Sequence, residues 1–318
     1  MSEPVLALDI GGTKLAVAVV TADGGVHGRI VEPTHPASGP DTILARLWNL
    51  GRRAIADAVG AGIPAPAAVG IGCGGPLDRH RGVLVRPLHL PGWIEVPIVA
   101  LASEAFGLPT ALDNDGSAAA RGEHHFGRGR GTSDMLYLTL STGVGGGAVV
   151  GGALLRGASG NAAEFGHVSV ATPGRACSCG RSGCLEAYAS GTSIADRAVE
   201  ALAAGRASSL AGAAVTSAAV IEAARTGDAL AQEIWDETLT LLARGVTDLV
   251  NVFEPELVVL GGGVTRSGEA LLAPLRDAVA RDALGPAARA RIELAALGDD
   301  VGLLGAAAVA FDREAARA

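Results

Sequence analysis

The stretch VLALDIGGTKLAVAVV, residues 5–20, organises the fold expected for this chain. Two apolar, β-prone runs flank a Gly-Gly-Thr break, which predicts a β-hairpin with strands at 5–10 and 15–20. A second unit of this kind is MLYLTLSTGVGGGAVV, with a strand at 135–140, a glycine-rich turn at 141–147 and a return strand at 148–150. One such unit opening each half predicts a duplicated α/β architecture whose two turns face a shared cleft.

The first turn carries groups suited to phosphate. Gly11 and Gly12 let the backbone approach a ligand, and successive amides in such a turn form a concave set of donors. Thr13 and Lys14 add a hydroxyl and an ammonium, and Asp9 could hold a magnesium ion through water. A plain tight turn is the alternative when the motif is taken alone. Two such turns at one cleft favour a nucleoside triphosphate. Neither turn has the Walker A spacing or leads directly into a helix, which disfavours P-loop and Rossmann folds.

Composition limits the function classes. A chain of 318 residues with 49% hydrophobic and 18% charged residues is long enough for two globular domains. The net charge of -8 argues against a nucleic-acid partner. The N-terminus has no basic region before its apolar run, so we expect no secretory signal and a cytoplasmic protein. Residues 135–155 carry no charge, but six glycines favour buried strands over a membrane span.

Residues 161–191 are the segment densest in groups that bind metals or sugars. His167, Cys177, Cys179 and Cys184 form a set of thiolate and imidazole donors that zinc prefers, and four protein ligands predict a structural ion. The small residues between them suit a loop that needs a metal to hold its shape. The alternative is three unrelated thiols and a surface histidine.

A strand-to-helix junction carries the candidate base. Asp113, Asn114 and Asp115 lie there, where side chains can project into a cleft. The helix N-terminus favours the charged form of Asp115, which keeps it available as a base. The alternative is that Asp115 only caps the helix. Periodicity predicts further helices at 41–59, 117–126, 192–204, 218–226, 228–252 and 302–318, and strands at 67–72, 110–112, 257–260 and 291–296.

Six motifs spread over nearly the whole chain occur together in one known family. They are DIGGTK at 9–14, DNDGSAAARGE at 113–123, STGVGGG at 141–147, AAEFGH at 162–167, CSCGRSGCLEAYASG at 177–191 and GGGV at 261–264. With them the chain resembles the ROK family (repressor, open reading frame, kinase), which includes bacterial glucokinases. The resemblance implies a two-domain actin/hexokinase-like fold of the duplicated ribonuclease H-like type, with the active-site cleft between the domains. We expect one domain at 1–113, joined by the C-terminal helix of about 302–318, and a second at 114–301 that contains the zinc segment 161–191.

The same resemblance implies a role for each candidate residue. Asp9 would position magnesium, and Gly11, Gly12, Thr13, Lys14, Thr142 and Gly143 would bind the phosphates of ATP. Gly261 and Gly262 would flank the adenosine. Asp115 would accept the proton of the sugar's 6-hydroxyl, and Asn114, Glu164, His167 and Glu186 would hold the other hydroxyls.

The resemblance predicts an ATP-dependent hexose kinase, with glucose as the expected sugar. Asp113, Ala163 and His89 stand where the family often has Glu, Gly and Asn, and parts of the pattern resemble the N-acetylmannosamine kinase branch. A kinase for N-acetylmannosamine or N-acetylglucosamine is therefore the alternative, and polyphosphate is a possible donor. Sugar-responsive regulators of the family place a DNA-binding module before the first hairpin, which here begins at residue 5. A sugar-responsive regulator without its DNA-binding domain is therefore the less favoured alternative to a kinase. We expect a homodimer or homotetramer, to which the long helix at 228–252 would contribute.

Overall fold

The predicted first hairpin forms the centre of one sheet. In the computed structural model, which describes residues 3–315, β1 (Val5–Ile10) pairs antiparallel with β2 (Lys14–Val20). The sheet has the order β3-β2-β1-β4-β7, in which β1, β4 and β7 are parallel. Its other strands are β3 (Val26–Pro33), β4 (Ala68–Cys73) and β7 (Thr110–Asn114).

The second hairpin builds a second sheet of the same design. Its order is β10-β9-β8-β11-β12, again with an antiparallel meander on one side and parallel strands on the other. The strands are β8 (Met135–Leu140), β9 (Val144–Val150), β10 (Ala153–Leu154), β11 (Leu257–Gly261) and β12 (Arg291–Leu294). The equal strand orders confirm the duplicated α/β architecture predicted from the two hairpins.

The second glycine-rich turn is shorter than predicted. We expected a turn over 141–147, but β9 already begins at Val144, and Gly145, Gly146 and Gly147 lie in the strand ladder opposite β8. The reason is packing: a side chain on Gly147 would stand 2.5 Å from Cβ of Ala120 on the neighbouring helix. Gly147 therefore permits close contact between β9 and α3, and the turn itself comprises only residues 141–143.

The two faces of the first sheet are packed by different kinds of residue. Leu6, Leu8 and Ile10 of β1 point to the face covered by α1 (Gly39–Gly60). The alternate residues Val5 and Ala7 point to α9 (Val301–Ala315). Small residues on this side let α9 lie close to the sheet. The C-terminal segment thus packs on the strands formed by the start of the chain.

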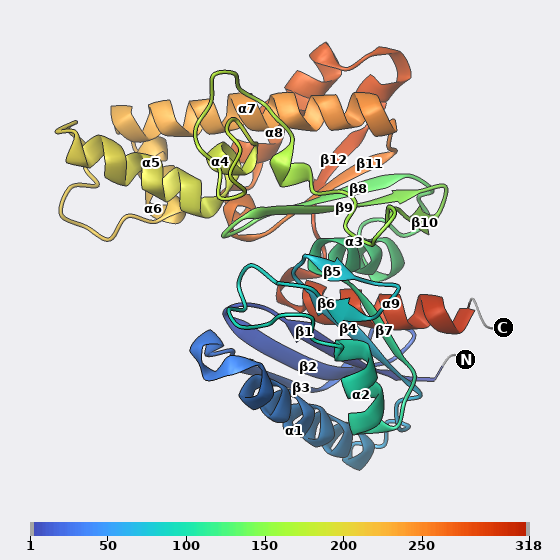
Figure 1. Cartoon of the computed structure of the whole chain (residues 1–318). Helices are drawn as coiled ribbons and strands as arrows, with labels where there is room; N and C mark the ends of the chain where they lie inside the picture. Colours follow the sequence, from blue (N-terminus) through green and yellow to red (C-terminus); the bar gives the residue numbers. More distant parts are fainter. Residues whose placement is uncertain (1–2, 316–318) are drawn as a thin grey trace.

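Two helices lie between the sheets. Figure 1 shows α3 (Asp115–Phe126) and α9 stacked between the strands of the two halves, with α3 against β9 and α9 against β1, β4 and β7. Both helices begin near the cleft, because α3 follows directly from β7 and Gly302 of α9 lies against the Asp9 carboxylate. This layer brings the ends of both sheets to one place.

The outer face of the second sheet is covered by the long helix α7 (Ala229–Phe253) and by α8 (Glu269–Asp282). Asp228 caps α7 by accepting a hydrogen bond from the Ala231 amide at 2.9 Å, and Thr216 caps α6 in the same way. The other elements are α2 (Ile98–Phe106), α4 (Glu186–Ala189), α5 (Gly191–Ala203), α6 (Ser217–Arg225), β5 (Leu77–Asp78) and β6 (Val83–Leu84). The predicted helices all form.

Within residues 3–315, none of the helices is both long and apolar enough to cross a bilayer. Residues 135–150 form β8 and β9, as expected from their glycine content. The last three residues of the helix predicted at 302–318 lie outside the described residues.

Candidate active site

Asp115 lies where β7 ends and α3 begins. Asn114 is the N-cap of α3, and its Oδ1 accepts a hydrogen bond from the Gly116 amide at 2.9 Å. Asp115 is the first residue of the helix, and its own Oδ1 accepts from the same amide at 2.8 Å. The capping role weighed for Asp115 therefore belongs chiefly to Asn114. The Asp115 side chain is exposed to solvent and stays available to a substrate.

Both hairpins approach Asp115. A Cβ added to Gly116 would overlap the Gly146 carbonyl of β9, which places the second hairpin beside the start of α3. Asp9, at the end of β1, lies close enough to Asp115 for their charges to repel. Glu164 feels the same repulsion from Asp115. The carboxylates expected from the sequence to serve magnesium, base and sugar thus share one site.

The protein around these carboxylates disfavours their charged forms. Burial raises the pKa of Asp9 to about 6, against the attraction of Lys14 and with a further contribution from Asp115. Desolvation by the surrounding atoms also raises the pKa of Asp115, while the Gly116 amide and His89 oppose that shift. Among the described residues, the Asp9 carboxylate has no hydrogen-bond donor. A half-buried carboxylate of this kind fits a site for a hydrated magnesium ion.

His89 was noted in the sequence only as a departure from the family pattern. A side chain on Gly12 would stand 2.5 Å from Cβ of His89, so the loop that carries His89 lies directly over the first glycine turn. The imidazole also stabilises the charge of Asp115. His89 therefore belongs to the site, although its sequence context, a proline-flanked loop, gave no signal of that.

A cavity of about 430 Å³ opens beside the second turn. The predicted Thr142 lines it, together with Ser141, Gly191, Gly263 and Val264 of the quoted motifs. The lining residues that the sequence did not suggest are Thr192, Ala195, Asp196, Val215, Thr216 and Ser217. Gly262 is exposed at this edge, whereas Gly261 is buried beneath the ring of Tyr137. The cavity is a concave, partly polar space of the size that a nucleoside fills.

Glu186 connects the second turn to the cysteine-rich segment. Its Oε2 accepts a hydrogen bond from the Val144 amide at 2.9 Å, and its Oε1 accepts from the Ser178 hydroxyl at 3.1 Å. Gly143 leaves room for this carboxylate, because a side chain there would stand 2.7 Å from Oε2. Glu186 thus holds the second turn in place.

Glu164 precedes the short helical turn Phe165–His167, and its side chain is exposed. Burial by nearby atoms raises its pKa, and the attraction of His167 opposes this shift. Glu164 therefore interacts electrostatically with both His167 and Asp115.

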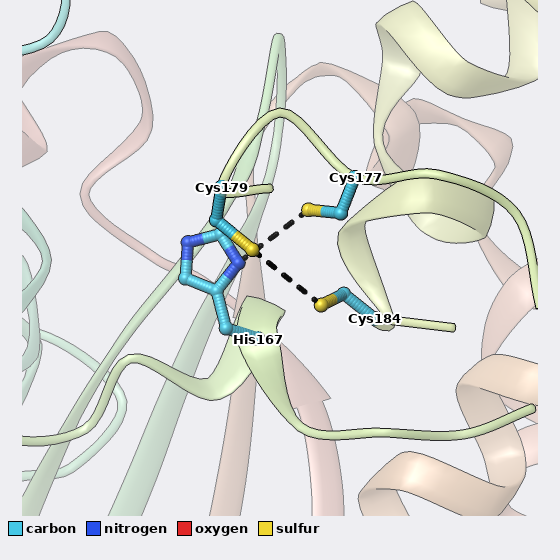
Figure 2. Close-up of side chains that lie close together, drawn as sticks. All are labelled: His167, Cys177, Cys179 and Cys184. Carbon is cyan, nitrogen blue, oxygen red and sulfur yellow. Dashed lines mark hydrogen bonds between the residues drawn. The ribbon is translucent and has the colours of Figure 1, made fainter. Parts of the chain in front are cut away.

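The four predicted metal ligands meet at one point (Figure 2). One donor atom from each of His167, Cys177, Cys179 and Cys184 lies within 4.8 Å of the others. The Cys179 and Cys184 sulfurs are 3.7 Å apart, as are the Cys177 sulfur and His167 Nδ1. A tetrahedral zinc site with bonds of about 2.3 Å has sulfur–sulfur edges of about 3.8 Å, so the donor set fits zinc.

The Cys184 thiol does not ionise readily without a bound cation. Burial raises the pKa of the Cys184 thiol to about 12, and the neighbouring thiols add to this shift. Only a cation would bring that sulfur to the thiolate form at neutral pH. The reading of three unrelated thiols is disfavoured by this convergence.

Comparison with known proteins matches the ROK family over residues 5–313. The chain is 37% identical to a glucokinase of Thermotoga maritima, with 97% of this chain and 98% of that protein covered. It is 38% identical to an N-acetylmannosamine kinase of Shigella flexneri, with 96% and 98% covered. Among solved structures it is similar to a ROK family glucokinase of Streptomyces griseus in complex with glucose and AMPPNP. That match has a TM-score of 0.79 and 35% identity and covers 97% of this chain and 99% of that one.

Proposed function

The chain belongs to the ROK family, and we propose that it is an ATP-dependent kinase that phosphorylates the 6-hydroxyl of a hexose, with glucose as the preferred sugar. The observation that carries the proposal is the position of Asp115. Its solvent-exposed carboxylate lies at the start of α3, where the helix packs on β9 of the second hairpin, and it interacts electrostatically with Asp9 of the first hairpin and with Glu164. A triphosphate bound by the turns would present its terminal phosphate at this carboxylate.

The proposed chemistry follows from what these groups can do. In phosphoryl transfer the enzyme mainly positions the reactants and neutralises charge. Asp115 would orient the 6-hydroxyl and accept its proton, which a carboxylate with a raised pKa does more readily than an ordinary aspartate. Asn114, Glu164 and His167 would bind other hydroxyls of the sugar. Glu186 would hold the second turn in place. In a different rotamer it would also bind a sugar hydroxyl.

Nucleotide binding is assigned to the two turns. Gly11, Gly12, Thr13 and Lys14 of the first turn and Thr142 and Gly143 of the second would bind the phosphates. Gly262 and the cavity beside it would take the adenosine, with Gly261 supporting them from below. Asp9 would hold magnesium through water, and the ion, when bound, supplies positive charge beside the terminal phosphates.

Zinc would have a structural role. His167, Cys177, Cys179 and Cys184 would bind it, and four protein ligands leave no open position for substrate. With Nδ1 of His167 directed at the sulfurs, Nε2 would carry the ring proton and would donate a hydrogen bond to a sugar hydroxyl. The folding of the cysteine-rich segment would then be coupled to sugar recognition.

We further propose that the chain divides into two domains, residues 1–113 with the helix of about 302–318, and residues 114–301. A cytoplasmic location and a homodimer or homotetramer remain predictions. Light scattering on the purified protein would measure the oligomeric state.

The deciding experiment is a substrate screen with the purified chain. Glucose, mannose, N-acetylglucosamine and N-acetylmannosamine are each offered with ATP or polyphosphate, and the sugar phosphate formed is measured directly. We expect the highest kcat/KM for glucose with ATP. A higher kcat/KM for N-acetylmannosamine would instead favour the alternative, an N-acetylmannosamine kinase. The chain is about as similar in sequence to such kinases as to glucokinases. No phosphorylation of any hexose would contradict the function itself.

A further inference from the structure

Asp113 is a fully buried carboxylate between two arginines. Its side chain is 0% exposed, and its Oδ2 accepts a hydrogen bond from Nε of Arg156 at 2.9 Å and lies 3.5 Å from Nε of Arg79. Arg79 follows β5 of the first half, whereas Arg156 follows β10 of the second sheet. Burial raises the pKa of Asp113 and the two arginines lower it, so the arginines are what make an ionised carboxylate tolerable here.

Arg156 begins a short segment that crosses to the first half, which we call the strap (residues 156–162). The Ala162 amide donates to the Arg156 carbonyl at 3.1 Å and closes the strap into a loop. Near its end, Asn161 donates through Nδ2 to the Leu77 carbonyl at 2.7 Å and accepts from the Leu77 amide at 3.1 Å. The strap is therefore attached to the first half at both ends, by Arg156 and by Asn161.

Polar contacts hold the strap, and apolar packing contributes little. Gly157, Ala158 and Ser159 are exposed, and none of the large buried side chains of the two cores comes from residues 156–162. Loss of a polar attachment should therefore displace the strap while the sheets stay folded. A variant with a displaced strap and intact sheets would therefore distinguish a positioning role of these residues from a role in overall folding.

Both attachments are close in the chain to residues that we propose to act on the sugar. Asp113 is two residues before Asp115 on the same strand end, and its Oδ1 accepts from the Asn114 amide at 3.1 Å. At the other end the strap leads through Ala163, which has a left-handed φ of 64°, directly to Glu164. A bound sugar would be held between Asp115, which directly follows β7 of the first sheet, and Glu164, which directly follows the strap and Ala163.

We propose that the strap positions Glu164 relative to Asp115, with Arg156 and Asn161 as positioning residues and Asp113 as the buried anchor. The attachment of the strap to the first half would set the distance between the carboxylates of Asp115 and Glu164. The identity of the sugar rests on the proposed function, but the attachment itself does not.

The first test replaces Asn161 by alanine. We expect the KM for the hexose to rise about tenfold, equivalent to about 1.4 kcal/mol of binding free energy, while the KM for ATP stays within about twofold. The matched control is Asn251→Ala, which also removes an asparagine bond to a backbone amide, that of Leu284, but far from the cleft. Equal KM values for the hexose in Asn161→Ala and wild type would overturn the proposal, as would an equal rise in the control.

The second test replaces Arg156 by alanine or lysine. Arg156→Ala should raise the hexose KM at least as much as Asn161→Ala, and Arg156→Lys should recover part of the loss because it keeps the charge beside Asp113. Arg206→Ala, which removes an exposed pair with Glu233, is the control and should leave both KM values unchanged. A lysine variant no better than the alanine variant would contradict the role assigned to the charge.

The third test needs no catalysis. Hydrogen exchange of the Leu77 amide reports the strap directly, because this amide donates to Asn161. We expect about tenfold faster exchange at Leu77 in both Arg156→Ala and Asn161→Ala, with exchange in β1 and β8 unchanged. Unchanged exchange at Leu77 in both variants would overturn the proposal even if the chain proves to be an active hexose kinase.

Discussion

Replacing Asp115 by asparagine separates the roles of base and helix cap. The structure makes the substitution mild for folding, because Asn keeps an Oδ1 acceptor for the Gly116 amide, which also has Asn114 as a partner. The raised pKa of Asp115 means that its charged form is disfavoured in the folded state near neutral pH. Removing the charge should therefore leave the free energy of unfolding unchanged or slightly higher.

The turnover number, in contrast, should fall sharply in Asp115→Asn. An asparagine cannot accept the proton of the 6-hydroxyl, and a positioned general base contributes about 10²- to 10⁴-fold. This is an increase in the activation free energy of about 2.7 to 5.5 kcal/mol. Because the contacts proposed between the sugar hydroxyls and Glu164 and His167 are kept, the Kd for the hexose should change by less than about threefold.

The assay measures kcat with saturating hexose and ATP, and the hexose Kd by calorimetry. The matched control is Asp228→Asn, since Asp228 also stands at a helix N-terminus, and accepts from the amides of Ala231 and Ser209. These hydrogen bonds lower its pKa, so its neutralisation should reduce the free energy of unfolding, by at most about 1 kcal/mol for a charge lost at an exposed helix N-terminus, while kcat is unchanged. A kcat for Asp115→Asn within about threefold of wild type would refute the assignment of the base.

Three further outcomes are expected. Cys179→Ser should remove the proposed zinc, as elemental analysis would show, destabilise the segment because metal binding is coupled to its folding, and abolish hexose binding. A metal-free variant with normal hexose affinity would show that zinc is not needed for sugar recognition. The base must be deprotonated to act, so kcat/KM should fall as the pH is lowered through the pKa of Asp115, which is raised above the ordinary value of 3.8. The residual activity of Asp115→Asn should lack this decrease at low pH. The same decrease in both proteins would argue against Asp115 as the base. Gly70→Ala should lower the thermal midpoint, because its Cβ would overlap the Ala306 carbonyl of α9 at a cost of about 1–3 kcal/mol, whereas Gly60→Ala, with open space around it, should not.

Several features of this protein could be predicted because they depend on short-range patterns. The two hairpins follow from alternation of apolar runs and glycines, and the helices follow from their periodicity and capping residues. The metal-binding set could be recognised because its cysteines lie within eight residues of one another, so chain connectivity alone keeps their side chains close.

The sequence alone determined the paired hairpins, the helices and the donor set that converges on one point, since hydrogen bonding and ligand spacing within a few residues encode them. Only the tertiary structure decided that Gly145, Gly146 and Gly147 lie in a strand, because the crowding at these positions comes from other segments: Thr139 at Gly145, Phe165 at Gly146 and α3 at Gly147. It also decided that Asn161 binds Leu77, 84 residues away in the chain, and that Arg156 binds Asp113, 43 residues away. Such pairs exist because α3 and α9 stack the two sheets against one layer, and no local pattern reports which distant side chains that stacking brings into contact.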